Sequence, residues 1–190
     1  MINKSYFWKK STLKVAKSLL GCTLVHRTKK GIISGKIVET EAYLHDDPAS
    51  HSFNGKTPRN DAMFNYPGIA YIYFTYGMHY CFNIVTNRKG IGEAVLIRAL
   101  EPIKGIDLMK KNRKIDSLHN LCNGPAKLVQ ALGITKKYNN HDLTKKPLYI
   151  LTKKSKQKYD LVKTTRIGIS QGSALLYRFY IKDNSFVSKK

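Results

Sequence analysis

The chain has 190 residues, 42% of them hydrophobic, and its 34 lysines and arginines against 12 aspartates and glutamates give a formal net charge of +22. This size predicts one domain with its own core, and the charge favours a polyanionic partner, above all nucleic acid, although a lysine-rich composition alone gives the same charge. The three cysteines and six histidines lack the spacing of a disulfide framework or a zinc site, so we expect a reducing compartment and no metal.

The first part of the chain predicts a helix and then two strands. Residues 11–21 space apolar side chains as a helix does, between a serine that can cap it and a terminal glycine. Residues 22–28 and 32–43 have strand patterns joined by Lys29-Lys30-Gly31, which indicates a hairpin. Residues 1–8 lack an apolar stretch of signal-peptide length, so we expect a cytoplasmic protein that does not enter a membrane.

An uncharged, tyrosine-rich window follows an expected ordered loop over residues 45–67. Residues 62–87 carry no formal charge, and they contain five of the twelve tyrosines. Within this window, residues 70–85 alternate as two strands interrupted by Tyr76-Gly77, which predicts a hairpin with an aromatic tip. Such a hairpin on a basic protein suits DNA, since lysines bind phosphates while flat rings stack on bases or wedge between them. A hairpin buried in the core fits the same pattern.

The remaining sequence predicts further helices and strands without an internal repeat or a domain boundary. The expected strands cover residues 92–99, 166–169 and 175–182, and the expected helices cover residues 106–112 and 126–132. Residues 136–158 are the most polar segment, and we expect them to form a flexible excursion.

Two of the carboxylates stand apart because they lie in a strand pattern. Glu39, Glu41 and Tyr43 share one strand face, since side chains two residues apart point the same way. Carboxylates about 7 Å apart on a strand, beside an aromatic ring, can raise each other's pKa and serve as a general base. A salt-bridged strand at the sheet surface fits the same pattern, with Arg98 as the candidate partner.

A series of motifs spread over residues 11–187 resembles one enzyme family in order and composition. The motifs are Ile37-Val-Glu-Thr-Glu-Ala-Tyr43, Ala49-Ser-His51, Thr57-Pro-Arg-Asn60, Tyr71-Ile-Tyr-Phe-Thr-Tyr-Gly-Met78, Cys81-Phe-Asn83, Leu96-Ile-Arg-Ala-Leu-Glu-Pro102, Asn123-Gly-Pro-Ala-Lys-Leu128 and Arg166-Ile-Gly168. They resemble the alkyladenine, or 3-methyladenine, DNA glycosylases. The resemblance implies a single α+β domain over residues 1–190, with a curved, mainly antiparallel sheet flanked by helices, a protruding hairpin that inserts into DNA, and no organic cofactor.

The resemblance also implies a reaction. The enzyme would be a monomer that flips a damaged purine, of the 3-methyladenine, 7-methylguanine or hypoxanthine type, out of double-stranded DNA and hydrolyses its N-glycosidic bond. Glu41 matches the general base that activates the attacking water. Arg98 and the backbone carbonyl of Ile167 match groups that hold this water.

Five aromatic or polar residues match the family's contacts with the flipped nucleotide. Tyr43, His51 and Tyr73 match the pocket for the base. Asn83 matches a residue that clashes with the amino group of guanine, and Tyr76 matches the side chain that fills the gap in the duplex. The chain is one residue shorter than the mammalian pattern between Tyr43 and His51, so the pocket width, and with it the range of lesions, stays open.

The sequence alone leaves two alternative functions open. A catalytically silent protein that kinks the minor groove would need the aromatic wedge but neither Glu41 nor Arg98. A glycosylase-lyase would use a lysine as a Schiff-base nucleophile. We expect the neighbours Ile72, Phe74 and Phe82 of the hairpin to pack in the core.

Overall fold

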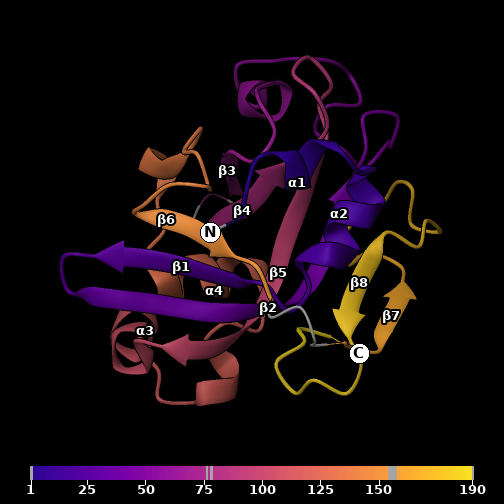
Figure 1. The fold of residues 1–190 in the computed structure, drawn as a ribbon. Coiled ribbons are helices and arrows are strands. Elements are labelled where there is room, and N and C mark those ends of the chain that lie inside the picture. The colour runs from indigo at the N-terminus through magenta and orange to yellow at the C-terminus, as the bar shows by residue number, and fades with distance from the viewer. Residues whose placement is uncertain (1, 76, 78, 154–157, 190) are drawn as a thin grey trace.

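One antiparallel sheet, to which the described residues contribute eight strands, curls around the apolar core (Figure 1). The computed structural model describes residues 2–75, 77, 79–153 and 158–189. The strands are β1 (Thr23–Thr28), β2 (Gly31–Tyr43), β3 (Ala70–Thr75), β4 (His79–Val85), β5 (Ala94–Lys104), β6 (Leu148–Leu151), β7 (Leu161–Thr164) and β8 (Arg178–Ile181). Their order is β3-β4-β5-β2-β1-β6, and β8 pairs with both β2 and β7.

The long strand β2 organises the sheet. Strand β5 runs along β2 from Ser34 to Tyr43, whereas β1 pairs with residues 31–36 and β8 with residues 39–41. Between β2 and β5 the register shifts, so that Val38 and Arg98 have no partner across the ladder. Such bulges bend a strand and redirect a side chain, and they often lie beside functional sites. Here the irregularity falls between Glu39 and the residues around Arg98.

Short helices cover the sheet. They are α1 (Ser5–Trp8), α2 (Thr12–Leu19), α3 (Ile106–Arg113) and α4 (Pro125–Leu132), with the 3-10 turns η1 (Asp61–Phe64), η2 (Leu118–Asn120) and η3 (Lys136–Tyr138). Helix α2 packs against β2, and α4 packs against β4 and β5, so that Leu19, Phe82 and Leu128 meet in one buried cluster. Among the described residues, no helix is long and apolar enough to span a membrane.

The predicted α+β class and the antiparallel sheet are confirmed, and some boundaries change. The helix expected over residues 11–21 is α2, but the side chain of Ser11 makes no capping hydrogen bond. The strand expected over residues 92–99 is β5, which begins at Ala94 and continues to Lys104. The hairpin of β1 and β2 has the expected position.

Two predictions for the C-terminal half are wrong. Residues 136–158 were expected to be a flexible excursion, yet their described part contains β6, which pairs with β1 and buries Leu148 and Ile150 completely. Residues 166–169 were expected to form a strand, but they lie in a turn after β7, where Gly168 adopts a φ of 74° that interrupts extended structure. This turn directs the backbone of Ile167 toward β2.

The tyrosine-rich window forms the expected antiparallel pair of β3 and β4, from Ala70 opposite Ile84 to Thr75 opposite His79. Ile72 and Phe82 are fully buried, as predicted. The prediction for Phe74 is wrong, because this side chain is 45% exposed, and its ring lies 5.0 Å from that of Tyr80 in the outer part of the hairpin. Tyr76 lies outside the described residues, so its role as a wedge in DNA stays a prediction.

Candidate active site

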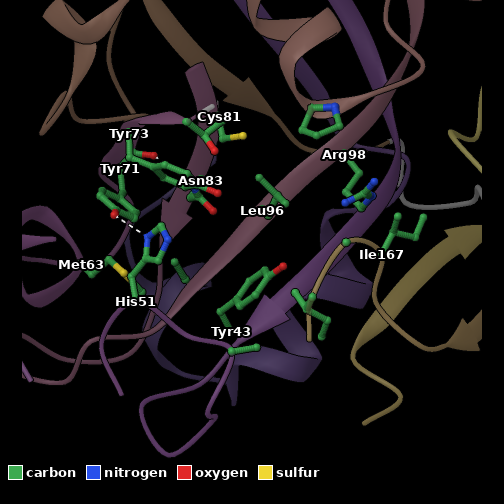
Figure 2. Close-up of a pocket in the computed structure, with 16 residues that line it drawn as sticks. Tyr43, His51, Met63, Tyr71, Tyr73, Cys81, Asn83, Leu96, Arg98 and Ile167 are labelled. Carbon is green, nitrogen blue, oxygen red and sulfur yellow. Dashed lines mark hydrogen bonds between the residues drawn. The ribbon is translucent and has the colours of Figure 1, made fainter. Parts of the chain in front are cut away.

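A cavity of about 440 Å³ opens where β2, β3, β4 and β5 meet two loops. The lining includes predicted site residues from all these segments: Tyr43, His51, Tyr73, Asn83, Arg98 and Ile167. Figure 2 shows the cavity with two groups of side chains. His51, Tyr71 and Tyr73 lie together on one side, Arg98 and Ile167 lie on the other, and Tyr43 lies between the two groups.

The aromatic side is a cluster of three rings. Tyr71 and Tyr73 lie on the same face of β3, with ring centroids 5.4 Å apart. The ring of His51 stands nearly perpendicular to Tyr73, at 4.5 Å between centroids, and its Nδ1 bonds to the Tyr71 hydroxyl at 2.9 Å. Because all three rings contact one another, their orientation is fixed before any ligand arrives.

The loop that carries His51 is held in place by Asn60, the last residue of the motif Thr57-Pro-Arg-Asn60. The buried side chain of Asn60 donates to the carbonyl oxygens of His51 and Gly55, at 2.6 and 2.9 Å.

Burial lowers the pKa of His51 below its ordinary value, and the positive charge of Arg59 lowers it further. The imidazole is therefore neutral at pH 7, and it can accept a hydrogen bond with one nitrogen and donate with the other.

The charged side is centred on Glu41, which is fully buried. One carboxylate oxygen accepts a hydrogen bond from the backbone N–H of Ile167 at 2.8 Å and faces Arg98 Nη1 at 3.3 Å. The other oxygen accepts from the Tyr43 hydroxyl at 2.9 Å. Glu41 itself does not line the cavity, whereas Tyr43, Arg98 and Ile167 do. The carboxylate therefore lies directly behind the cavity wall, oriented by three neighbours that form that wall.

Tyr43 belongs to both sides of the cavity. Burial raises the pKa of its hydroxyl, and the negative charge of Glu41 raises it further, so the hydroxyl stays protonated and donates to the carboxylate. Its ring faces the cavity from the end of β2. One residue thus supplies an apolar surface for a ligand and a hydrogen bond that orients Glu41.

Glu39 takes part in a buried charge cluster next to Glu41. Its Oε1 bonds to Arg178 at 2.7 Å and lies 3.5 Å from Arg98 Nε, and its Oε2 accepts from the backbone N–H of Ser188 at 2.7 Å. Arg98 therefore lies between the carboxylates of Glu39 and Glu41. The expected ion pairs with Arg98 are present for both Glu39 and Glu41, although they lie inside the protein and not at the sheet surface.

Several lining residues escaped sequence reasoning. Tyr71 lies two positions before Tyr73, so the strand alternation was a signal that placed both rings on one face. Asn83 was predicted as a site residue. The hydrogen bond that holds its side chain, from its amide nitrogen to the Tyr71 carbonyl at 3.1 Å, was not predicted. Met63 and Cys81 also line the cavity, and nothing in their spacing marks them. Burial raises the pKa of Cys81, so this thiol stays protonated.

The described residues contain no group of three histidine, cysteine or acidic side chains placed to hold a metal ion. The described lining of the cavity also contains no lysine. The polar groups that line the cavity or lie directly behind its described wall are the Glu41 carboxylate, the guanidinium, the imidazole, the tyrosine and Thr75 hydroxyls, the thiol, the asparagine amide and the backbone.

Known proteins resemble this chain over nearly its whole length. The family model for methylpurine-DNA glycosylase (MPG) matches residues 6–185. A protein of Carboxydothermus hydrogenoformans named "Putative 3-methyladenine DNA glycosylase" is 55% identical over the whole of both chains. Proteins with the same name are 55% identical in Francisella tularensis, over 94% of each chain, and 48% identical in Methanoculleus marisnigri, over 97% of each chain. The chain therefore belongs to the methylpurine-DNA glycosylase family, and it is a DNA glycosylase.

Proposed function

We propose that this glycosylase removes damaged purines from double-stranded DNA by holding the flipped base in the aromatic cavity and hydrolysing its N-glycosidic bond with a water activated by Glu41. The observation that carries this proposal is the placement of Glu41. A fully buried carboxylate lies directly behind the wall of a cavity that has rings on its other side.

The cavity suits a flipped nucleotide. The bond to be cut is inaccessible in stacked DNA, so the enzyme has to extrude the nucleotide, at a cost of a few kcal/mol that is lowest for damaged or mispaired bases. The cavity volume of about 440 Å³ is in the usual range of small-molecule sites, about 300–1,000 Å³. Tyr43 offers its ring to one face of the purine, and His51 and Tyr73 offer theirs to the other.

The charged side supplies the chemistry. Tyr43, Ile167 and Arg98 occupy three of the about four acceptor sites of the Glu41 carboxylate, so one site remains for a water. The oxygen of this water attacks the sugar C1′ while Glu41 takes a proton from the water. The purine leaves with the electrons of the glycosidic bond. The negative carboxylate also stabilises the positive charge that develops on the sugar. Arg98 and the carbonyl of Ile167 orient the water.

The same surfaces select the base. Electron-rich rings attract a cationic alkylated purine by about 0.5–2 kcal/mol, which favours lesions of the 3-methyladenine and 7-methylguanine type. Asn83, fixed by its bond to the Tyr71 carbonyl, opposes the exocyclic amino group of guanine, which 7-methylguanine keeps, so the positive charge of that lesion has to offset this opposition. Hypoxanthine has no such amino group and fits the same site. We assign the protein to duplex DNA as a monomer, with Tyr76 filling the gap in the helix.

The two other functions considered above have less support. A silent DNA-binding protein has no use for a buried carboxylate whose oxygens are bonded to three residues of the cavity wall. A lyase would need a lysine amine near C1′, and the described lining contains none.

Duplexes that each carry one lesion test this function. The protein should release free purine base and leave an abasic site that breaks only after alkali, and borohydride should trap no covalent protein–DNA adduct. Binding without release from any duplex would support the silent DNA-binding protein instead. A trapped adduct would support a lyase.

A further inference from the structure

A buried ion pair between Asp47 and Arg166 lies next to the cavity and has no part in the mechanism above. The two side chains are 1% and 0% exposed. Arg166 Nη2 donates to Asp47 Oδ1 at 2.8 Å, and Nη1 donates to Oδ2, so the pair is bidentate. Removing two charges from water is costly, and an apolar pair of similar volume is often as stable or more stable. Fold stability alone is therefore a weak reason for this pair.

The guanidinium of Arg166 covers the rear of Tyr43. Its Cζ lies 4.7 Å from the centroid of the Tyr43 ring, and Nη1 donates to the carbonyl of Ala42 at 3.1 Å. Tyr43 lines the cavity, whereas Arg166 is buried and is not among the described lining residues. The guanidinium thus lies on the side of the ring that faces away from the cavity.

Asp47 connects this arginine to the opposite wall. Its Oδ1 accepts from the backbone N–H of Ala49 at 3.0 Å, and its carbonyl accepts from the N–H of Ser50 at 2.8 Å. These bonds shape the loop that presents Ala49 and His51 to the cavity. Asp47 therefore belongs to the loop of the aromatic side, while its partner Arg166 supports the ring of Tyr43.

We infer that Asp47 is a specificity-determining residue, which keeps the rear of Tyr43 electrically neutral so that a cationic purine can stack on the front. This inference rests on the proposed function, because it takes Tyr43 as a surface for the base. A ring attracts a cation through its electron-rich face. An unpaired guanidinium on the opposite face would repel that same cation through the ring. The Asp47 carboxylate cancels this repulsion, and a neutral purine does not experience it.

The size of the effect follows from the separation of the charges. The 4.7 Å from Arg166 to the ring, added to a stacking distance of about 3.5–4 Å, places a stacked base about 8 Å from the guanidinium. At an effective dielectric constant of about 20, one uncompensated charge at this distance disfavours a cation by about thirty-fold, which is about 2 kcal/mol. A neutral base does not experience this repulsion, so its binding should weaken only as far as the loop that Asp47 shapes is misplaced.

The test compares one cationic and one neutral lesion in matched duplexes. Single-turnover excision of 7-methylguanine and of hypoxanthine is measured for the wild type, Asp47→Asn, Arg166→Met and the double variant Asp47→Asn/Arg166→Met. Glu101→Gln is the control, because it adds the same net charge at a carboxylate that pairs with Lys36 and is not among the described lining residues. Thermal unfolding of each variant reports the structural cost separately.

We expect Asp47→Asn to lower the ratio of 7-methylguanine to hypoxanthine excision by about ten- to thirty-fold, and the double variant to bring this ratio back toward that of the wild type even if both rates fall. Glu101→Gln should leave the ratio unchanged. Equal losses on both lesions in Asp47→Asn, or a double variant with the same altered ratio, would reduce the pair to a structural role. A wild type that releases neither base would instead overturn the proposed function, and the inference with it.

Discussion

The two sides of the cavity are built in different ways. The aromatic side comes from neighbours in the chain, since Tyr71 and Tyr73 share β3 and His51 lies on the loop before it, and its rings are held by contacts with one another. The charged side unites Glu41 of β2, Arg98 of β5 and Ile167 after β7, and its carboxylate is held by charge and hydrogen bonds. One side can bind a base and the other can act on the bond, so mutations should separate binding from chemistry.

The largest effect should come from Glu41→Gln, which keeps the shape of the side chain and removes the base and the charge. We expect the single-turnover rate of base release to fall by at least about 10²–10⁴-fold, the usual contribution of a general base. Affinity for a duplex with an abasic-site analogue should change by only a few fold. A variant that still releases base at a near-normal rate would remove Glu41 from the mechanism.

Arg98→Ala should have the next largest effect, and it should also affect folding. The rate of release should fall by about 10²–10³-fold, because a positioned donor near the reacting water is lost. The free energy of unfolding should fall by about 3–5 kcal/mol, since Glu39 and Glu41 lose a buried partner. Denaturant unfolding measures the second quantity. An unchanged rate in a destabilised variant would show that other groups hold the water.

A pH titration should address the aromatic side alone. The fold lowers the pKa of His51, so the neutral imidazole and its contribution to stability are fully present above the ordinary value of about 6.5 and are lost as the pH falls through the lowered pKa. Below that point a cationic imidazole should weaken capture of a cationic purine by about tenfold or more. The low-pH loss should be absent in His51→Gln. A variant with the same pH profile as the wild type would assign the titration to another group.

The smallest effect is expected for Tyr43→Phe, which removes one hydrogen bond to Glu41 and leaves the ring. Ile167 and Arg98 still hold the carboxylate, so the rate should fall by only about three- to tenfold, as for a single hydrogen bond of about 0.5–1.5 kcal/mol. Base affinity should stay the same. A loss as large as that of Glu41→Gln would mean that the hydroxyl takes part in the reaction itself.

Much of the sheet was predictable because its signals are local. Lys29-Lys30-Gly31 marked the turn between β1 and β2, and alternation marked β3 and β4. Strand β6 escaped because only four residues form it, within a polar segment, and its burial depends on pairing with β1. The turn around Ile167 has a strand-like sequence, but Gly168 with its φ of 74° interrupts the strand, and the bond of Arg166 to Asp47 anchors the chain beside it.

The candidate site shows the same difference between local signals, which the sequence reveals, and contacts made by tertiary packing, which it does not. Glu39, Glu41 and Tyr43 were expected on one strand face, and their side chains do lie together there. The charge pattern already offered Arg98 as a salt-bridge partner, whereas only the resemblance named Ile167, and no pattern in the sequence places its backbone against Glu41. Arg98 reaches it through a register shift between β2 and β5, and the pairing of Asp47 with Arg166 joins residues 119 positions apart. Contacts of this kind depend on tertiary packing and leave no periodic trace.

The most direct test of the claim that one side of the cavity binds the base and the other carries out the chemistry compares Glu41→Gln and His51→Ala on one lesion duplex. Two quantities are measured for each variant: the rate of base release at saturating protein, and the protein concentration that gives half of that rate. Glu41→Gln should lose the saturating rate by at least about 10²-fold and keep the half-saturating concentration within a few fold. His51→Ala should mainly raise the half-saturating concentration and keep most of the saturating rate. Proportional losses of both quantities in both variants would contradict the account, because they would show that the two sides of the cavity act as one unit.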